Sequence, residues 1–234
     1  MIPAWSKRNA AARPCGGVTD LDTERQIETL PVNAGFRTVA SAGRLDRVAK
    51  ALRSNGIDAV VVDKVSDARA KVLELVPTEA EVGTGTSESL SRSGILDDLA
   101  SGRYDYVAPK IRALDRATQA GQIRKLRASP NYMLGSVHAV TEDGVAIVAS
   151  QTGSQLGPYA NGAERVIWVI GGQKIVSDLD EGLRRIREYS YPMMDAEAQR
   201  RYGVRSGISK VLIVFRETVP HRITAILVRE ELGY

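Results

Sequence analysis

Glycine and hydroxyl side chains are concentrated in one short stretch, Val82–Leu90 (VGTGTSESL), directly before an apolar-periodic segment. Glycine lets the backbone adopt positive φ angles and lets a ligand approach the amide groups closely. Amide groups at the start of a helix favour a phosphate or a carboxylate, and hydroxyls can donate to the same oxygens. We therefore expect this loop to hold an anion through Gly83, Gly85, Thr86, Ser87 and Ser89.

Two further polar loops follow predicted strands. One is Ser150–Gln155 (SQTGSQ); the other is Gly171–Lys174 (GGQK), whose lysine supplies a positive charge. Ligands of open α/β sheets bind beyond the carboxyl ends of the strands, so neighbouring strands that point the same way would bring the three loops to one crevice. The further predicted ligand-binding residues are Ser136, His138, Thr152, Gly153, Ser154, Gln155, Gly172 and Lys174.

Each loop taken alone also has a plain structural explanation. Thr86 or Ser87 is a suitable N-cap for the next helix, and SQTGSQ reads as an ordinary turn. Lys174 is by default a solvated lysine, and His138 lies in an alternating apolar run where a hydrogen-bonded structural histidine is common. The joint occurrence of the three loops is what favours a ligand site.

The sequence indicates a ligand site more clearly than a reaction. No Ser-His-Asp set can be read from the spacing, and the catalytic residues stay unknown. Glu88, Glu142 and His138 are weak candidates for an acid, a base or a nucleophile. Helix caps and surface residues are the competing interpretation of the two glutamates.

Composition excludes several classes of function. The chain has 234 residues, 43% hydrophobic, with a net charge of +4 and no nucleic-acid-binding module, so we expect no nucleic acid as a partner. Cys15 is the single cysteine, and His138 and His221 lack metal-ligand spacing, so neither a disulfide within the chain nor a metal site is expected. No apolar stretch is long enough for a signal peptide or a membrane span, which predicts a cytoplasmic protein without membrane association.

Strands and helices alternate through the first half of the chain. Ile57 to Val62 is a nearly continuous apolar run typical of a buried strand, and Leu90 to Leu99 is helical in pattern. Tyr104 to Ala108 is predicted as a strand, and Ile111 to about Ala128 as one long helix whose basic face we interpret as solvated surface. Such alternation predicts an α/β fold with a mostly parallel sheet flanked by helices.

The second half contains antiparallel elements. Asp143-Gly144 between two apolar runs indicates a hairpin. A helix beginning at Asp178 is expected to close at Pro192, and residues 193–209 are left unassigned. The two last strands, KVLIVF and RITAILV, are predicted to be antiparallel to each other. We expect residues 1–34 to form a flexible or loosely docked arm, with a short helix at 23–30, and residues 35–234 to form a single domain.

Several ordered segments resemble the LUD (lactate utilization) domain family. They are VGTGTSESLSRSGI, the long block LGSVHAVTEDGVAIVASQTGSQLGPYANGAERVIWVIGGQKIVSDLDEGLRRI, and the terminal ITAILVREELGY. The resemblance runs from about Ala40 to Tyr234. It implies a fold related to ribose-phosphate isomerase, glucosamine-phosphate isomerase and CoA-transferases, in which a similar glycine loop wraps a sugar phosphate.

The resemblance also implies a function. Family members take part in oxidation of L-lactate to pyruvate, often beside separate iron–sulfur proteins. For this chain it implies a small-molecule- or anion-binding subunit of an oxidoreductase system. The ligand would be a small carboxylate or a phosphate-bearing molecule, iron–sulfur subunits would be partners, and assembly into a homo-oligomer stays open. A phosphosugar isomerase or CoA-ester enzyme, or a non-catalytic scaffold, are the alternatives.

This chain departs from the family pattern at three places. Residues 193–209 contain no cysteine where longer relatives carry a cysteine-rich segment, so no cofactor is expected in this chain itself and any iron–sulfur cluster belongs to a partner. Ser154 and Gln155 stand where Asn and Arg are usual, and glutamine cannot clamp a carboxylate as arginine does. His138 stands where Asn is common.

Overall fold

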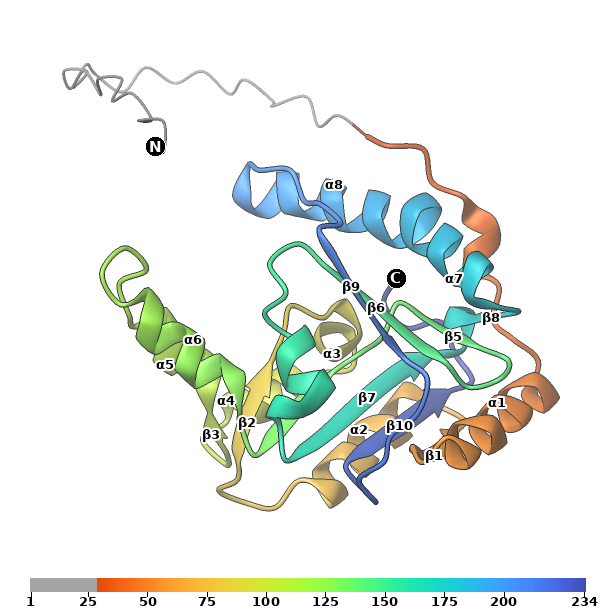
Figure 1. The fold of residues 1–234 in the computed structure, drawn as a ribbon, viewed down its shortest axis with the longest axis horizontal. Helices are drawn as coiled ribbons and strands as arrows, with labels where there is room; N and C mark the ends of the chain where they lie inside the picture. Colours follow the sequence, from red (N-terminus) through yellow and green to blue (C-terminus); the bar gives the residue numbers. More distant parts are fainter. Residues whose placement is uncertain (1–28) are drawn as a thin grey trace, which may run out of the picture.

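A six-stranded, all-parallel sheet is the centre of the computed structural model, which describes residues 29–234 (Figure 1). Cys15, most of the predicted arm and nearly all of the predicted helix at 23–30 lie outside the described residues. The strand order is β1-β10-β7-β4-β2-β3, and every neighbouring pair is parallel. Its strands are β1 (Asp58–Val62), β2 (Glu81–Thr84), β3 (Asp105–Tyr106), β4 (Tyr132–Gly135), β7 (Arg165–Gly171) and β10 (Ile223–Val228).

A second, smaller sheet has the order β8-β5-β6-β9. Its strands are β5 (Ala139–Thr141), β6 (Ala146–Ser150), β8 (Ile175–Val176) and β9 (Lys210–Val214). β5 and β6 form the antiparallel hairpin predicted at Asp143-Gly144, and Gly144 has the positive φ of 83° that its turn requires. β8 joins β5 in parallel.

The predicted pairing of the last two strands is wrong. β9 is antiparallel to β6 at the edge of the small sheet, whereas β10 lies between β1 and β7 in the large one. Their burial explains the separation: β9 has exposed residues, and β10 is buried almost throughout. A strand covered on both faces fits the centre of a parallel sheet.

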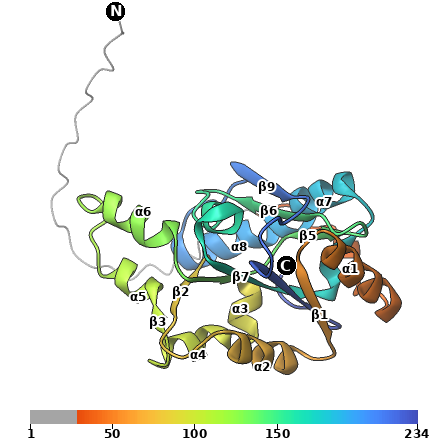
Figure 2. The same cartoon turned by 60° about the horizontal axis from the view of Figure 1, so that its bottom comes forward.

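The molecule is layered, as Figures 1 and 2 show. One face of the large sheet packs against α2 (Val65–Leu75), α3 (Glu88–Arg92) and α4 (Ile95–Ala100). Its other face packs against the small sheet and α1 (Ala42–Ser54). α7 (Leu179–Arg185) covers the outer side of the small sheet and leads into α8 (Tyr191–Tyr202). Four short helical turns lie between these elements, at Ala34–Arg37, Pro158–Gly162, Gly172–Lys174 and Ile186–Ser190.

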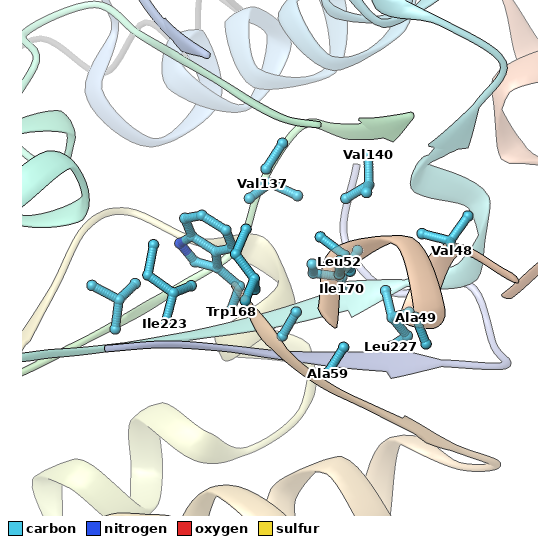
Figure 3. Packing of buried hydrophobic residues seen from close by; sticks show 14 of the residues in the cluster. Val48, Ala49, Leu52, Ala59, Val137, Val140, Trp168, Ile170, Ile223 and Leu227 are labelled. Atoms are coloured by element: carbon cyan, nitrogen blue, oxygen red, sulfur yellow. The ribbon is translucent and has the colours of Figure 1, made fainter. Parts of the chain in front are cut away.

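Strand β7 divides the core into two halves. Trp168 and Ile170 face the small sheet, and Ile167 and Val169 face α2 to α4, as alternation along a strand requires. Trp168 is fully buried and meets the ring of Tyr159 edge to face, with 5.6 Å between the ring centroids. Figure 3 shows the apolar side chains that surround this tryptophan. Aromatic contacts of this geometry add to the stability gained from burial.

The long helix predicted for residues 111–128 is two helices, α5 (Val107–Arg112) and α6 (Ala120–Ala128), which project as an arm beside β3 (Figure 2). The strand predicted at 104–108 is correspondingly short. Asp115 causes the break, because its carboxylate accepts hydrogen bonds from the Ala117 amide and the Thr118 hydroxyl, both at 2.8 Å. These bonds stabilise a turn in place of a helical register.

Pro192 does not end a helix as predicted. A π-helical turn, Ile186–Ser190, follows α7 and continues without a break into α8, and Pro192 lies in the first turn of α8. α8 fills much of the unassigned segment up to Tyr202. Among the helices of residues 29–234, none combines the length and apolarity needed to cross a membrane.

Gly135 generates a test of this packing. A Cβ at Gly135 would lie 1.7 Å from the Tyr159 hydroxyl, and that ring is held by Trp168. We expect Gly135→Ala to lower the free energy of unfolding in urea by about 1–3 kcal/mol, the usual cost of overpacking. Gly121→Ala is the control, because no atom lies within 4 Å of its Cβ position, and it should be neutral or stabilising. Equal stability of the two variants would contradict this account.

Candidate functional site

The carboxyl ends of three adjacent strands, β2, β4 and β7, meet at one edge of the large sheet. A cavity of about 30 Å³ lies there, and it is lined from all three predicted loops: by Gly85 to Ser89, by Gln155, and by Lys174. Ser136 and His138, which follow β4, complete its polar lining. Strand β4 lies between β2 and β7, so the glycine loop after β2 and the GGQK loop after β7 flank the residues that follow β4. The SQTGSQ loop follows β6 and reaches the cavity from the small sheet.

Lys174 is a buried lysine, not the solvated one of the default interpretation. It is 2% exposed, and its Nζ donates hydrogen bonds to the hydroxyl oxygens of Ser89 at 3.0 Å and Ser136 at 3.1 Å. Within residues 29–234 no carboxylate forms a salt bridge with it. Burial, assisted by the positive charges of Arg185 and Arg92, holds the pKa of this amine well below its usual value.

His138 is both a structural residue and part of the cavity wall. Its Nδ1 accepts a hydrogen bond from the Ala149 amide at 3.1 Å, which leaves the ring proton on Nε2. Burial, followed by the charges of Lys174 and Arg185, lowers the pKa of His138 to about 3. The imidazole is therefore neutral at physiological pH.

The glycine loop combines capping with close approach. Ser87 is the N-cap of α3, because its hydroxyl oxygen accepts a hydrogen bond from the Leu90 amide at 3.3 Å, which confirms the structural interpretation of this serine as a cap. A Cβ at Gly85 would lie 3.1 Å from Cβ of Gln155. Glycine at this position lets the Val82–Leu90 loop contact the SQTGSQ loop.

The SQTGSQ loop is a hydrogen-bonded turn whose flank faces the site. The Ser150 hydroxyl accepts from the Gly153 amide at 2.9 Å and donates to Oε1 of Gln155 at 3.1 Å. Gly153 has a positive φ of 84° and serves the turn itself. Thr152 and Ser154 line a hollow of about 240 Å³ between this loop and α8.

Besides Gly153, two predicted site residues lie away from the hollows. Glu142 sits at the tip of the β5–β6 hairpin and pairs with Arg44 of α1 at 2.7 Å, because the hairpin carries it away from the glycine loops that flank it in sequence. Gly172 is packed under α1, where a Cβ would lie 2.8 Å from Val39 and 2.9 Å from the Val228 carbonyl oxygen. Glycine there permits close packing and does not contact the cavity.

A wider cleft of about 450 Å³ adjoins the small cavity and shares Gly85 to Glu88, Met194 and Tyr234 with it. Its far wall carries Arg112, Arg116 and Arg127 from the α5–α6 arm. The interpretation of this basic face as plain solvated surface overlooked the cleft. The signal in the sequence was the excess of six basic residues over one acidic residue in segment 107–128.

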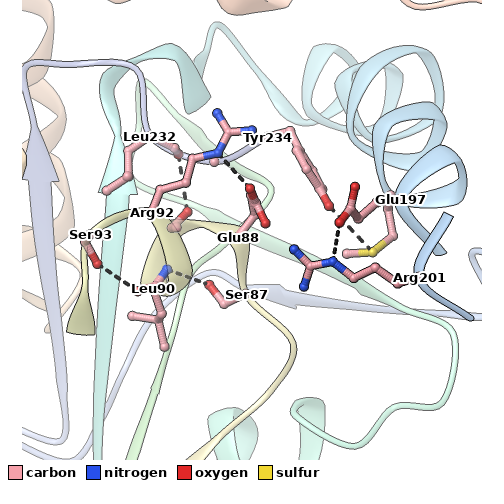
Figure 4. A network of polar contacts seen from close by, with 12 residues as sticks. Ser87, Glu88, Leu90, Arg92, Ser93, Glu197, Arg201, Leu232 and Tyr234 are labelled. Carbon is pink, nitrogen blue, oxygen red and sulfur yellow. Dashed lines mark hydrogen bonds and ion pairs between the residues drawn. The ribbon is translucent and has the colours of Figure 1, made fainter. Parts of the chain in front are cut away.

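Two glutamates also line the wide cleft, and each has its own arginine (Figure 4). Glu88 pairs with Arg92 at 2.7 Å, and Glu197 pairs with Arg201. Tyr234 lies beside them, and burial raises the pKa of its phenol to about 12. Of the catalytic candidates, Glu88 and His138 thus lie at the hollows.

The tail of the chain completes the site, which the sequence did not predict. Gln173 donates from Nε2 to the carbonyl oxygens of Leu232 at 3.1 Å and Gly233 at 2.9 Å, and its Oε1 accepts from the Leu232 amide. The Ser89 hydroxyl donates to the same Leu232 carbonyl at 3.2 Å. These bonds place Tyr234 against the cavity.

Comparison with known proteins agrees with the sequence resemblance. Residues 45–228 match the family described as LUD domain. Among solved structures, the chain is similar to a DUF162 family protein from Deinococcus radiodurans, with 15% sequence identity and a TM-score of 0.49, covering 82% of this chain and 99% of that one. No protein with a curated description matches.

His138 generates a prediction for the pH dependence of stability. The unfolded state takes up a proton near pH 6.5, whereas the folded state resists protonation down to about pH 3. Folding therefore loses stability as the pH falls through this window, by up to about 1.4 kcal/mol per pH unit. We expect His138→Asn, whose amide oxygen can replace Nδ1 as acceptor, to lose this contribution.

The measurement is urea unfolding of both proteins between pH 7 and pH 4. The stability of His138→Asn relative to wild type should rise steadily as the pH is lowered. His221→Asn, at an exposed histidine, is the control substitution. Parallel stability curves for wild type and His138→Asn would show that the buried imidazole does not resist protonation.

Proposed function

Because the chain belongs to the LUD domain family, we propose that it binds a small 2-hydroxy or 2-oxo carboxylate at Lys174 and acts in lactate utilization. In this proposal the chain is the substrate-binding component of a system that oxidises L-lactate to pyruvate. The two electrons of that oxidation would pass to a separate iron–sulfur subunit, and the two protons to water. The family supports the link to lactate, and the geometry around Lys174 supports the choice of a carboxylate.

The observation that carries the proposal is the buried amine of Lys174. A buried lysine usually has a carboxylate partner, because an unpaired buried charge is costly. Among residues 29–234, the hydrogen-bond partners of the Lys174 amine are the two serine hydroxyls, and the lysine lines a cavity shared with the glycine loop. A carboxylate ligand would supply the missing negative charge, and perturbed groups of this kind cluster at functional sites.

The charge balance around the cavity also favours an anion. His138 is neutral, while Arg185 is fully buried and stacks over the ring of Tyr189 at 5.0 Å. Arg185 donates to the carbonyl oxygen of His138 and to the hydroxyl of Ser190. This buried guanidinium places a positive charge near the cavity, as an arginine in place of Gln155 would.

Glu88 favours a second candidate function, an isomerase or CoA-ester enzyme that uses a glutamate. Its side chain faces both the small cavity and the wide cleft, and Arg92 keeps a charge partner beside it. Turnover of phosphosugars or CoA esters that disappears in Glu88→Gln would support this candidate. Lack of turnover by the wild-type protein across such a panel would remove it.

Binding of the carboxylate should be coupled to proton uptake. The free amine has a lowered pKa, and a bound carboxylate raises it again, so binding favours uptake of a proton by the amine. Titration calorimetry with lactate and with pyruvate, in buffers of different ionisation enthalpy, measures this uptake. We expect Lys174→Met to weaken binding at least roughly tenfold and to abolish the uptake.

The control is Lys50→Met, which removes an exposed lysine from α1 and should leave both quantities unchanged. Circular dichroism establishes that both variants are folded. The proposal fails if neither carboxylate produces heat with the wild-type protein, or if Lys174→Met binds as tightly as wild type.

A further inference from the structure

We propose that the wide cleft is a second anion site, in which Arg112, Arg116 and Arg127 bind the phosphate groups of an organic phosphate. The proposal goes beyond the carboxylate site because it uses different residues on a different element. The two sites are adjacent, since the cleft and the small cavity share the loop from Gly85 to Glu88.

Three separate segments bring the arginines to one wall. Arg112 ends α5, Arg116 lies in the connection, and Arg127 lies near the end of α6. The turn at Asp115 folds these segments together. A continuous helix would hold the three residues along a single rod, so their convergence depends on this break.

The charge of the three arginines is not balanced within the described chain. No salt bridge or hydrogen bond joins Arg112, Arg116 or Arg127 to another group in residues 29–234. The nearby carboxylates already have partners. Asp105 forms a salt bridge with Lys110, and Asp115 accepts the two hydrogen bonds that form its own turn.

The acids on the cleft wall are engaged as well, Glu88 with Arg92 and Glu197 with Arg201. Some arginines elsewhere have a carboxylate partner, as Arg69 has Asp98 and Arg229 has Asp63. The cleft therefore keeps an uncompensated positive wall.

The shape and lining of the cleft favour an organic phosphate. Guanidinium groups bind phosphate oxygens in a bidentate fork, and several of them suit a group with more than one negative charge. Thr86 and Ser87, both hydroxyl-bearing residues, also line the cleft. Apolar side chains complete the lining and can cover an organic body: Leu96, Val107, Ile111, Leu126 and Met133.

Calorimetry at low salt with inorganic pyrophosphate, ADP and coenzyme A tests the proposal. The test variant is Arg112→Gln/Arg127→Gln. The matched control is Arg124→Gln/Lys125→Gln, which removes the same charge from exposed positions of α6 outside the cleft. We expect the test variant to bind pyrophosphate at least roughly tenfold more weakly than wild type, and the control to bind within about twofold.

Equal weakening in the two variants would show a general electrostatic field and overturn the proposal, as would absence of pyrophosphate binding by the wild-type protein. ADP or coenzyme A should bind more tightly than pyrophosphate, because the apolar wall covers the organic part. Equal or weaker binding of both would overturn the organic-phosphate assignment.

Lys174→Met separates this proposal from the preceding one. It should retain pyrophosphate binding while losing carboxylate binding. If the wild-type protein binds pyrophosphate through Arg112 and Arg127 but binds no carboxylate, the carboxylate site is refuted and the phosphate site is retained. Loss of pyrophosphate binding in folded Lys174→Met would refute a separate arginine site.

Discussion

The buried amine of Lys174 is the constraint on which the arrangement of the site depends. It follows β7 and binds Ser89, which follows β2, and Ser136, which follows β4. These two hydrogen bonds join the carboxyl ends of three adjacent parallel strands. An amine removed from water must keep its polar partners, so the two serines are fixed as firmly as the lysine. Ser89 also binds the Leu232 carbonyl, which extends the same restraint to the tail of the chain.

The electrostatics of the site follow from the same burial. Lys174, His138 and Arg185 lie close together, and the two basic residues lower the pKa of the imidazole in addition to its desolvation. Desolvation also lowers the pKa of Arg185, to about 10. Three basic groups near one cavity disfavour each other's charged forms. A bound anion has the opposite effect, because its negative charge favours the protonated form of each basic group.

Elements that local patterns determine could be predicted, and elements that depend on distant partners could not. The Asp143-Gly144 hairpin was predicted correctly because turn chemistry is encoded in a few adjacent residues. The predicted pairing of β9 with β10 was wrong because the residue pattern of a strand does not indicate which strand it pairs with. Glu142 lies near the loops in sequence only, and the break at Asp115 depends on a side chain that also occurs in helices.

The two hollows differ in how firmly their walls are held. The cavity at Lys174 is built on the central strands, whose side chains belong to the two large apolar clusters. The arm that carries the arginines has a small cluster of its own, made by Val107, Ile111 and Ile123. Regions with few buried apolar contacts open at low free-energy cost. In the proposed arrangement of two sites, we therefore expect the arginine wall to adjust to ligands of different size and the lysine end to stay fixed on the sheet.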